Sequence, residues 1–325
     1  MDGNAQKNAP ISRIFAAIRR RLGQTGTEAT SQPLITKCLW FDEEEGIARI
    51  SSLQEHWLKD AVLSLRNNGF ALLPANVASD LCDQIMSEFK SYAASRADSS
   101  NYRDKWGLHE RLANLHLVSP SARQLALNPR IIQLMSLLFE NAPRVVGSLL
   151  FEKGSTQSIH RDTPAFFTNP LNNYFGVWTA LQDIDEDAGP LTYYPGGHRL
   201  VPDADLYSER LGSDQYFKVI IDACKDAALP LTRFFPKKGD TLVWHPQLPH
   251  GGGSRLNPAA PRHSMVFHYM NASAAIYPPN DFFAGNKLLP ARQVLKTLAI
   301  GQISAIDHGQ PQFFHNREEG NFDEF

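Results

Sequence analysis

The sequence predicts an all-β core with α-helical additions, and two observations carry this expectation. Helix-like patterns fill the first part of the chain. After Pro143 a series of strand-like segments follows, separated by turn signals and without a helix between each pair. Such an order is typical of a β-barrel or a double-sheet jelly roll with a helical front. With 325 residues, 42% of them hydrophobic, the chain can bury a sizeable core.

The helical front is expected from three amphipathic segments. Apolar residues recur every four positions from Leu53, and Asn67-Asn68-Gly69 ends that helix before a short strand at 70–73. A second helix follows Ser79. Asn128-Pro129 starts a third, because Asn caps a helix and Pro suits its first turn.

The strand-like segments have the turn signals of β-proteins at their ends. Residues 203–227 interrupt them and are expected to be partly helical. The expected strands are Arg144–Phe151, Tyr174–Leu181, Leu191–Tyr194, Thr241–Trp244 and Arg262–Met270.

These patterns predict a division of the chain into three parts. Residues 1–50 form an extension and linker, in which the basic segment 11–22 is expected to be an accessory helix. Residues 51–300 form one domain, with the helical front at 51–142 and the jelly-roll core at 143–275. Residues 301–325 form a polar tail, which is expected to be loose from Arg317 onwards.

Composition excludes several classes of function. The formal net charge is −2, which gives no general attraction to nucleic acid or an anionic membrane. No apolar run has the length of a membrane span. Cys38, Cys82 and Cys224 are scattered and odd in number, as expected of reduced thiols in an intracellular protein. We therefore expect a cytoplasmic protein that does not bind nucleic acid. The pattern leaves its oligomeric state open.

A histidine and a carboxylate stand two residues apart at His160 and Asp162. Residues i and i+2 of an extended strand point to the same face, so both can reach one ion. A second histidine would complete the two-histidine, one-carboxylate set of non-haem Fe(II) oxygenases. His250 is the candidate, because the glycines after it allow close backbone approach. His245, beside Pro246, is interpreted as structural.

The order of motifs around these residues resembles the phytanoyl-CoA dioxygenase family of Fe(II)/2-oxoglutarate-dependent oxygenases. The resemblance spans roughly residues 50–275. The matching segments, in order, are His160-Arg161-Asp162, Val177-Trp178-Thr179-Ala180-Leu181, Gly189-Pro190-Leu191, Pro195-Gly196-Gly197-His198, Gly239-Asp240-Thr241, His245-Pro246 and Leu248-Pro249-His250-Gly251-Gly252.

The resemblance implies a double-stranded β-helix, that is, a cupin-like jelly roll, with Fe(II) held by His160, Asp162 and His250. It also implies 2-oxoglutarate as cosubstrate and O2 as oxidant. Arg262 would pair with the far carboxylate of 2-oxoglutarate, since its rigid fork suits a carboxylate. Trp178 would lie against 2-oxoglutarate, with a plain core tryptophan as the alternative. Ser264 would add a hydroxyl from the same strand face as Arg262.

The reaction that this resemblance implies is hydroxylation of an unactivated carbon of a small-molecule substrate, a mid-sized organic compound, with decarboxylation of 2-oxoglutarate to succinate. Relatives that halogenate have a small residue where Asp162 stands, so halogenation is not expected. Phe166, Phe167 and Tyr193 are candidates for substrate contact, with lid or core packing as the alternative. Desaturation, cyclisation or epimerisation by the same cofactors also fits, as does a non-catalytic jelly-roll binding protein. The sequence shows no clear cradle for a coenzyme A group.

Overall fold

The computed structural model describes residues 31–155, 157–291 and 295–314. Within them, nine strands form a major sheet. Along the sheet they follow the order β14 (Thr297–Ile300), β15 (Ile303–Ile306), β4 (Pro143–Phe151), β11 (Ser264–Asn271), β6 (Tyr174–Ala180), β9 (Thr241–Trp244) and β2 (Phe70–Leu73). In addition β3 (Arg111–Ala113) pairs with β4, and β16 (Gln312–Phe314) pairs with β3. Neighbouring strands are antiparallel, except β15 and β4.

A smaller sheet supplies the second layer of the jelly roll. It consists of β10 (His250–Gly252), β7 (Leu191–Tyr193) and β8 (Thr232–Phe234), in that order. Two short pairs lie outside both sheets: β1 (Gln32–Pro33) with β13 (Leu288–Leu289), and β5 (Thr168–Asn169) with β12 (Ala275–Ile276). The predicted jelly roll is therefore confirmed.

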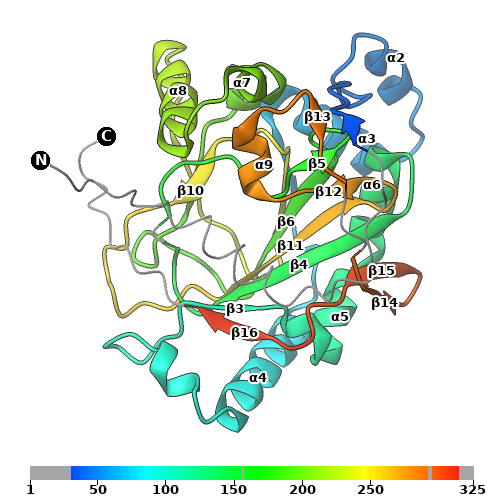
Figure 1. The fold of residues 1–325 in the computed structure, drawn as a ribbon. Helices are drawn as coiled ribbons and strands as arrows, with labels where there is room; N and C mark the ends of the chain where they lie inside the picture. Colours follow the sequence, from blue (N-terminus) through cyan, green and yellow to red (C-terminus); the bar gives the residue numbers. More distant parts are fainter. Residues whose placement is uncertain (1–30, 156, 292–294, 315–325) are drawn as a thin grey trace, which may run out of the picture.

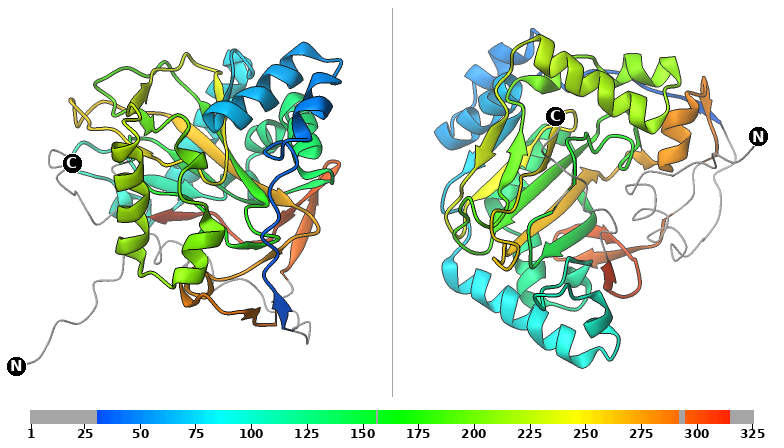
Figure 2. Two further views of the ribbon diagram at one scale, coloured as in Figure 1. Left: turned by 90° about the horizontal axis from the view of Figure 1, so that it is seen from above. Right: turned by 90° about the vertical axis from the view of Figure 1, so that its left-hand side faces the viewer.

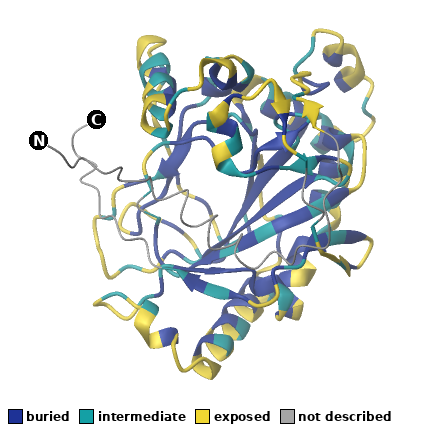
Figure 3. Cartoon of the chain, in the orientation of Figure 1, coloured by how far each residue is buried: buried dark blue, intermediate teal, exposed yellow. Residues whose placement is uncertain are grey.

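Alternation along the strands of the major sheet gives it two different faces. One face packs on helices, and residues such as Val177, Val243 and Phe267 join a large apolar cluster with them. These helices are α2 (Gly46–Ser51), α3 (His56–Asn68), α4 (Ser79–Ser95), α5 (Pro120–Ala126) and α6 (Pro129–Phe139). The neighbouring residues Trp178 and Val266 point to the opposite face, toward the smaller sheet. Figure 3 shows the buried strands beneath helices whose outer surfaces are exposed.

The segment between β7 and β8 is helical, as predicted. It contains α7 (Asp203–Glu209) and α8 (Ser213–Asp226), and α9 (Pro279–Ala284) packs beside α7. Figures 1 and 2 show α8 and α4 at opposite ends of the molecule, with the sheets between them. A fully buried ion pair anchors this segment: Nη1 of Arg161 lies 2.8 Å from Oδ1 of Asp203.

Helix boundaries follow the local signals in the sequence. Gly69 ends α3 at φ = 82°, a left-handed conformation that glycine adopts without strain. The side chain of Asn128 accepts hydrogen bonds from the backbone N–H groups of Arg130 and Ile131, and Pro129 occupies the first position of α6. Both ends were predicted.

Two expected boundaries were wrong. Residues 303–314 are not a polar tail, because Ile303, Ala305 and Phe313 bury apolar side chains in the core as parts of β15 and β16. Likewise, Phe41 and Ile50 of the expected N-terminal extension are fully buried in the same cluster. The predicted helix at 11–22 and the predicted loose segment from Arg317 lie outside the described residues. No described helix has the length and hydropathy of a membrane span.

Candidate metal and oxoacid site

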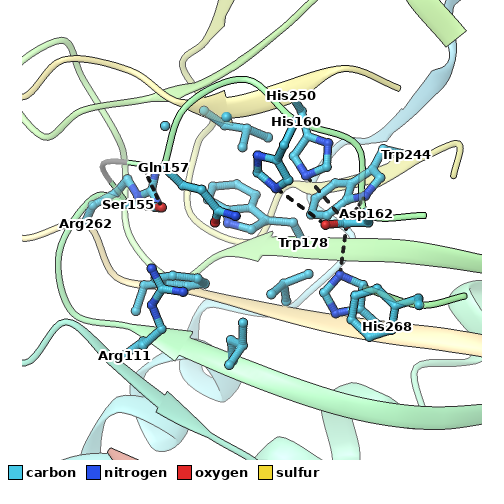
Figure 4. Close-up of a pocket in the computed structure, with 17 residues that line it drawn as sticks. Arg111, Ser155, Gln157, His160, Asp162, Trp178, Trp244, His250, Arg262 and His268 are labelled. Carbon is cyan, nitrogen blue, oxygen red and sulfur yellow. Dashed lines mark hydrogen bonds and ion pairs between the residues drawn. The ribbon is translucent and has the colours of Figure 1, made fainter. Parts of the chain in front are cut away.

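Three predicted ligands meet between the two sheets. His160 and His250 exchange backbone N–H···O hydrogen bonds of 2.9 Å in both directions, which brings their side chains together. Nε2 of His160 lies 3.5 Å from Oδ1 of Asp162, and Nε2 of His250 lies 3.6 Å from Oδ2. The ligand atoms of these three buried residues all lie within 4.8 Å of one another. They can therefore hold one ion (Figure 4).

The two imidazoles already have the orientation that a metal requires. Nδ1 of His160 lies 2.7 Å from the carbonyl oxygen of Ser158, and Nδ1 of His250 lies 2.9 Å from that of Leu248. A carbonyl only accepts, so each Nδ1 carries the hydrogen and each Nε2 keeps its lone pair. Bonds of this kind fix the tautomer and ring orientation of metal-binding histidines. The residues present therefore fit a divalent metal.

The charges at this position also suit a cation. Burial alone would raise the pKa of Asp162, but the neighbouring His250 and the hydrogen bond from His268 hold it well below its ordinary value. Burial lowers the pKa of His250 to about 4. At neutral pH the site therefore combines an ionised carboxylate with a neutral imidazole, which is the protonation state that ligation needs.

Two buried arginines lie in the same pocket, away from the three ligands (Figure 4). Arg262 is 1% exposed and donates to the carbonyl oxygen of Gly189 at 2.9 Å. Arg111, on β3, is 3% exposed. Both guanidinium groups lie near the ring of Phe151, at 5.7 and 5.5 Å. Among the described residues, no carboxylate forms an ion pair with either arginine.

Unpaired buried cations are costly, and their pKa values reflect this cost. Burial, with smaller contributions from Arg255 and Arg111, lowers the pKa of Arg262 to about 9. Burial lowers that of Arg111 to about 10. Both groups remain charged at neutral pH, so this end of the pocket favours an anion. A carboxylate would supply the missing counter-charge and match the planar fork of Arg262.

The other predicted cosubstrate residues are placed as follows. Trp178 lines the pocket, with its ring centre 6.0 Å from the guanidinium carbon of Arg262. Arg262 lies just before β11, and its backbone N–H donates to the carbonyl oxygen of Glu152. Ser264 does not line the pocket. Its hydroxyl is buried, without a hydrogen-bond partner among the described residues.

One of the three predicted substrate residues lies in the pocket. Phe166 lines it and stacks on His268, with ring centres 4.0 Å apart. The prediction for Phe167 was wrong, because this side chain is fully buried against Tyr207, Tyr277 and Phe282. Tyr193 is also misplaced: its ring packs against Phe70 at 4.7 Å, outside the pocket. His245 is structural, as predicted, with Nε2 3.0 Å from Oδ2 of Asp42.

Several residues in or beside the pocket were not predicted. His268 stands four residues after Ser264 on β11, and thus on the same strand face by the period of two, so strand periodicity was the signal that could have found it. Trp244 was expected only as the end of a strand, yet its Nε1–H donates to Asp162. Arg111 had no local signal, because only the pairing of β3 with β4 brings it here. Phe217 of α8 lies edge-on to His160, with ring centres 6.4 Å apart.

The pocket is half-open and is lined by both polar and apolar side chains. It has a metal-binding group at one end and a cationic group at the other. The fold and site thus define a jelly-roll protein that can hold a divalent metal and an organic anion in one pocket.

Comparison with known proteins identifies the family. The sequence profile of the family described as "Phytanoyl-CoA dioxygenase (PhyH)" matches residues 65–264, more than half of the chain. The protein belongs to this family.

Curated relatives are similar over part of their length. Phytanoyl-CoA dioxygenase domain-containing protein 1 of Danio rerio is 23% identical over 195 residues, which cover 54% of this chain and 62% of the relative. The peroxisomal phytanoyl-CoA dioxygenase of Mus musculus is 32% identical over 126 residues, covering 38% and 35%. The chain thus spans less than two thirds of the curated relatives it matches.

Solved structures share the fold. The epimerase SnoN, in complex with Fe3+, alpha ketoglutarate and nogalamycin RO, has a TM-score of 0.58 at 21% identity, covering 77% of this chain and 98% of SnoN. The carbocyclase SnoK has a TM-score of 0.57 at 19% identity, covering 76% and 95%. EctD from S. alaskensis, with 2-oxoglutarate and 5-hydroxyectoine, has a TM-score of 0.57 at 15% identity, covering 87% and 98%.

Proposed function

We propose that this protein is an Fe(II)/2-oxoglutarate-dependent dioxygenase that hydroxylates an unactivated carbon of a mid-sized organic substrate. The observation that carries the proposal is the convergence of His160, Asp162 and His250 in the same pocket as the unpaired cation Arg262. Family membership supports it, because phytanoyl-CoA dioxygenase gives the family its name.

Each group of the pocket has a role in this proposal. His160, Asp162 and His250 would hold Fe(II), leaving open positions, as two-histidine, one-carboxylate sites do. Arg262 would bind the far carboxylate of 2-oxoglutarate, and Arg111 would add a second positive charge. When bound, iron and 2-oxoglutarate supply the oxidising chemistry, with O2 as oxidant and succinate and CO2 as products.

The chain's own residues orient the reactants and exclude water. Trp178 and Phe166 give the pocket an apolar lining between its polar ends, and Phe217 adds an aromatic edge beside His160. An apolar wall strengthens the electrostatic contacts of bound anions and limits side reactions with water. The substrate is therefore expected to be an organic molecule that places one carbon near the three metal ligands.

A second candidate is epimerisation, cyclisation or desaturation with the same cofactors. SnoN and SnoK, which share this fold, are described as an epimerase and a carbocyclase. Because the outcome depends on where the substrate carbon lies, the same triad serves either reaction. A non-catalytic binding protein is disfavoured, since it would not need oriented metal ligands facing an anion site.

A substrate screen with Fe(II), 2-oxoglutarate and O2 tests the proposal. Succinate release identifies turnover, and mass spectrometry of the product identifies the reaction. A gain of one oxygen supports hydroxylation. Loss of two hydrogens, or an unchanged mass with changed stereochemistry, supports the second candidate. If the protein releases no more succinate than a His250→Ala variant, with every compound of the screen and also without added substrate, both candidate reactions are contradicted.

A further inference from the structure

Asp162 has two carboxylate oxygens in different surroundings. Oδ2 receives Nε1 of Trp244 at 3.1 Å and Nε2 of His268 at 3.2 Å. The indole N–H can only donate. The imidazole nitrogen that faces the same oxygen must also carry its hydrogen, because a lone pair there would be repelled. Two N–H groups therefore converge on Oδ2 (Figure 4).

Oδ1 is the oxygen that remains for an ion. It faces Nε2 of His160 at 3.5 Å, and that nitrogen has its lone pair free. Metal–ligand bonds of about 2.0–2.2 Å place neighbouring ligand atoms about 3 Å apart. Oδ2 also lies 3.6 Å from Nε2 of His250, but its lone pairs are already engaged by Trp244 and His268.

Packing holds both donors in place. His268 is 5% exposed and stacks on Phe166, whose backbone N–H in turn donates to the carbonyl oxygen of Asp162. Trp244 lies over Gly176, where a Cβ atom would sit only 2.1 Å from the indole. Glycine at 176 thus leaves room for the indole to reach Asp162, and neither donor can rotate away without displacing its neighbours.

We propose that His268 is a positioning residue for the metal site. With Trp244, its Nε2–H holds Oδ2 of Asp162 away from the ion, so that Asp162 ligates through Oδ1 alone. A carboxylate bound through both oxygens would occupy an additional coordination position. Single-oxygen ligation leaves three of six positions open, enough for a two-atom oxoacid ligand and O2. This inference rests on the proposed function.

Two variants of His268 separate the effect of its N–H donor from the effect of its bulk. His268→Phe keeps the bulk and the stack on Phe166 but removes the N–H group. His268→Gln restores an N–H donor. The probe is Co(II), which resists oxidation, with affinity measured by competitive titration and ligand geometry by visible absorption. Loss of a hydrogen bond to a metal ligand typically weakens metal binding 10–100-fold. We therefore expect about that loss of affinity and a changed absorption spectrum in His268→Phe, and an affinity within about threefold of wild type in His268→Gln.

His116→Phe is the matched control. His116 is also fully buried and contacts Phe267, the neighbour of His268 that faces the helices, but it bonds to Ser148 instead of Asp162. Its loss should leave the affinity and spectrum unchanged. The inference is overturned if His268→Phe binds Co(II) as wild type does with the same spectrum, or if His268→Gln fails as His268→Phe does. A wild-type protein that binds no Co(II) overturns the proposed function as well.

Discussion

The two ends of the pocket differ in how far they are completed by the protein itself. At the metal end, the two histidines and the aspartate have hydrogen bonds from their own chain that fix their orientation. At the arginine end, Arg262 and Arg111 are buried charges that form no ion pair with a described carboxylate. The metal end is therefore preorganised, whereas the arginine end requires a ligand to balance its charge.

The largest effect is expected from the metal end. His250→Ala removes one of three ligands, so Co(II) or Fe(II) affinity should fall at least about 100-fold, and succinate formation should fall to background. Competitive metal titration and a succinate assay measure these losses. His56→Ala, at an exposed histidine of α3, is the control and should change neither. Full activity in His250→Ala would show that the three residues are not a metal site.

The next effect separates the two ends. Arg262→Ala removes the buried partner of the proposed carboxylate, a change that costs roughly 2–5 kcal/mol in buried charge pairs. The KM for 2-oxoglutarate should therefore rise at least about 30-fold, whereas metal affinity should stay within about threefold. Arg262→Lys keeps the charge but loses the planar fork, so its KM for 2-oxoglutarate should lie between those of wild type and Arg262→Ala. Equal losses of metal and 2-oxoglutarate binding would contradict the division into two ends.

A smaller effect is expected at Arg111. Arg111→Gln removes a charge but leaves Arg262 to bind the carboxylate, so the KM for 2-oxoglutarate should rise about tenfold, as for loss of one charged hydrogen bond. The rate of succinate formation at varied 2-oxoglutarate concentration would measure it. A KM unchanged by this variant would restrict anion binding to Arg262.

These effects bear on what the sequence could predict. The metal ligands were predictable because His160 and Asp162 stand two residues apart and because His250 stands in a motif of fixed order. The extended strand expected at 160–162 is absent, and His160 forms only an isolated bridge with His250. Arg111 could not be predicted as a pocket residue, since its position depends on the pairing of β3 with β4. Phe167 and Tyr193 were misplaced because the sequence does not show which way a loop side chain or the last side chain of a short strand turns. The end of the domain was misjudged because β15 and β16 are short, with four and three residues.

The smallest effect concerns a buried histidine outside the pocket. Burial, with the nearby charges of His308 and Arg123, lowers the pKa of His116 to about 3. Between an ordinary pKa of about 6.5 and that value, the unfolded chain binds a proton that the folded chain does not. The free energy of unfolding should therefore fall as pH is lowered below about 6.5, by at most about 1.4 kcal/mol per pH unit for this group.

Urea unfolding of the metal-free protein between pH 7 and pH 5 measures this slope. His116→Phe should show a shallower slope than wild type, whatever its stability at pH 7. Identical slopes would mean that His116 is not kept neutral by burial. A change in slope without a change in Co(II) affinity would also confirm that buried imidazoles act on the metal only where they contact its ligands.

The central claim is that one pocket holds Fe(II) and 2-oxoglutarate together. Anaerobic titration of the protein with Fe(II) and then 2-oxoglutarate tests it most directly, because an oxoacid chelated to ferrous iron gives a visible charge-transfer absorption. We expect this absorption in wild type at one equivalent of each component and its loss in His250→Ala. In Arg262→Ala the absorption should appear only at higher concentrations of 2-oxoglutarate. Absence of the absorption in wild type at saturating concentrations of both would contradict it.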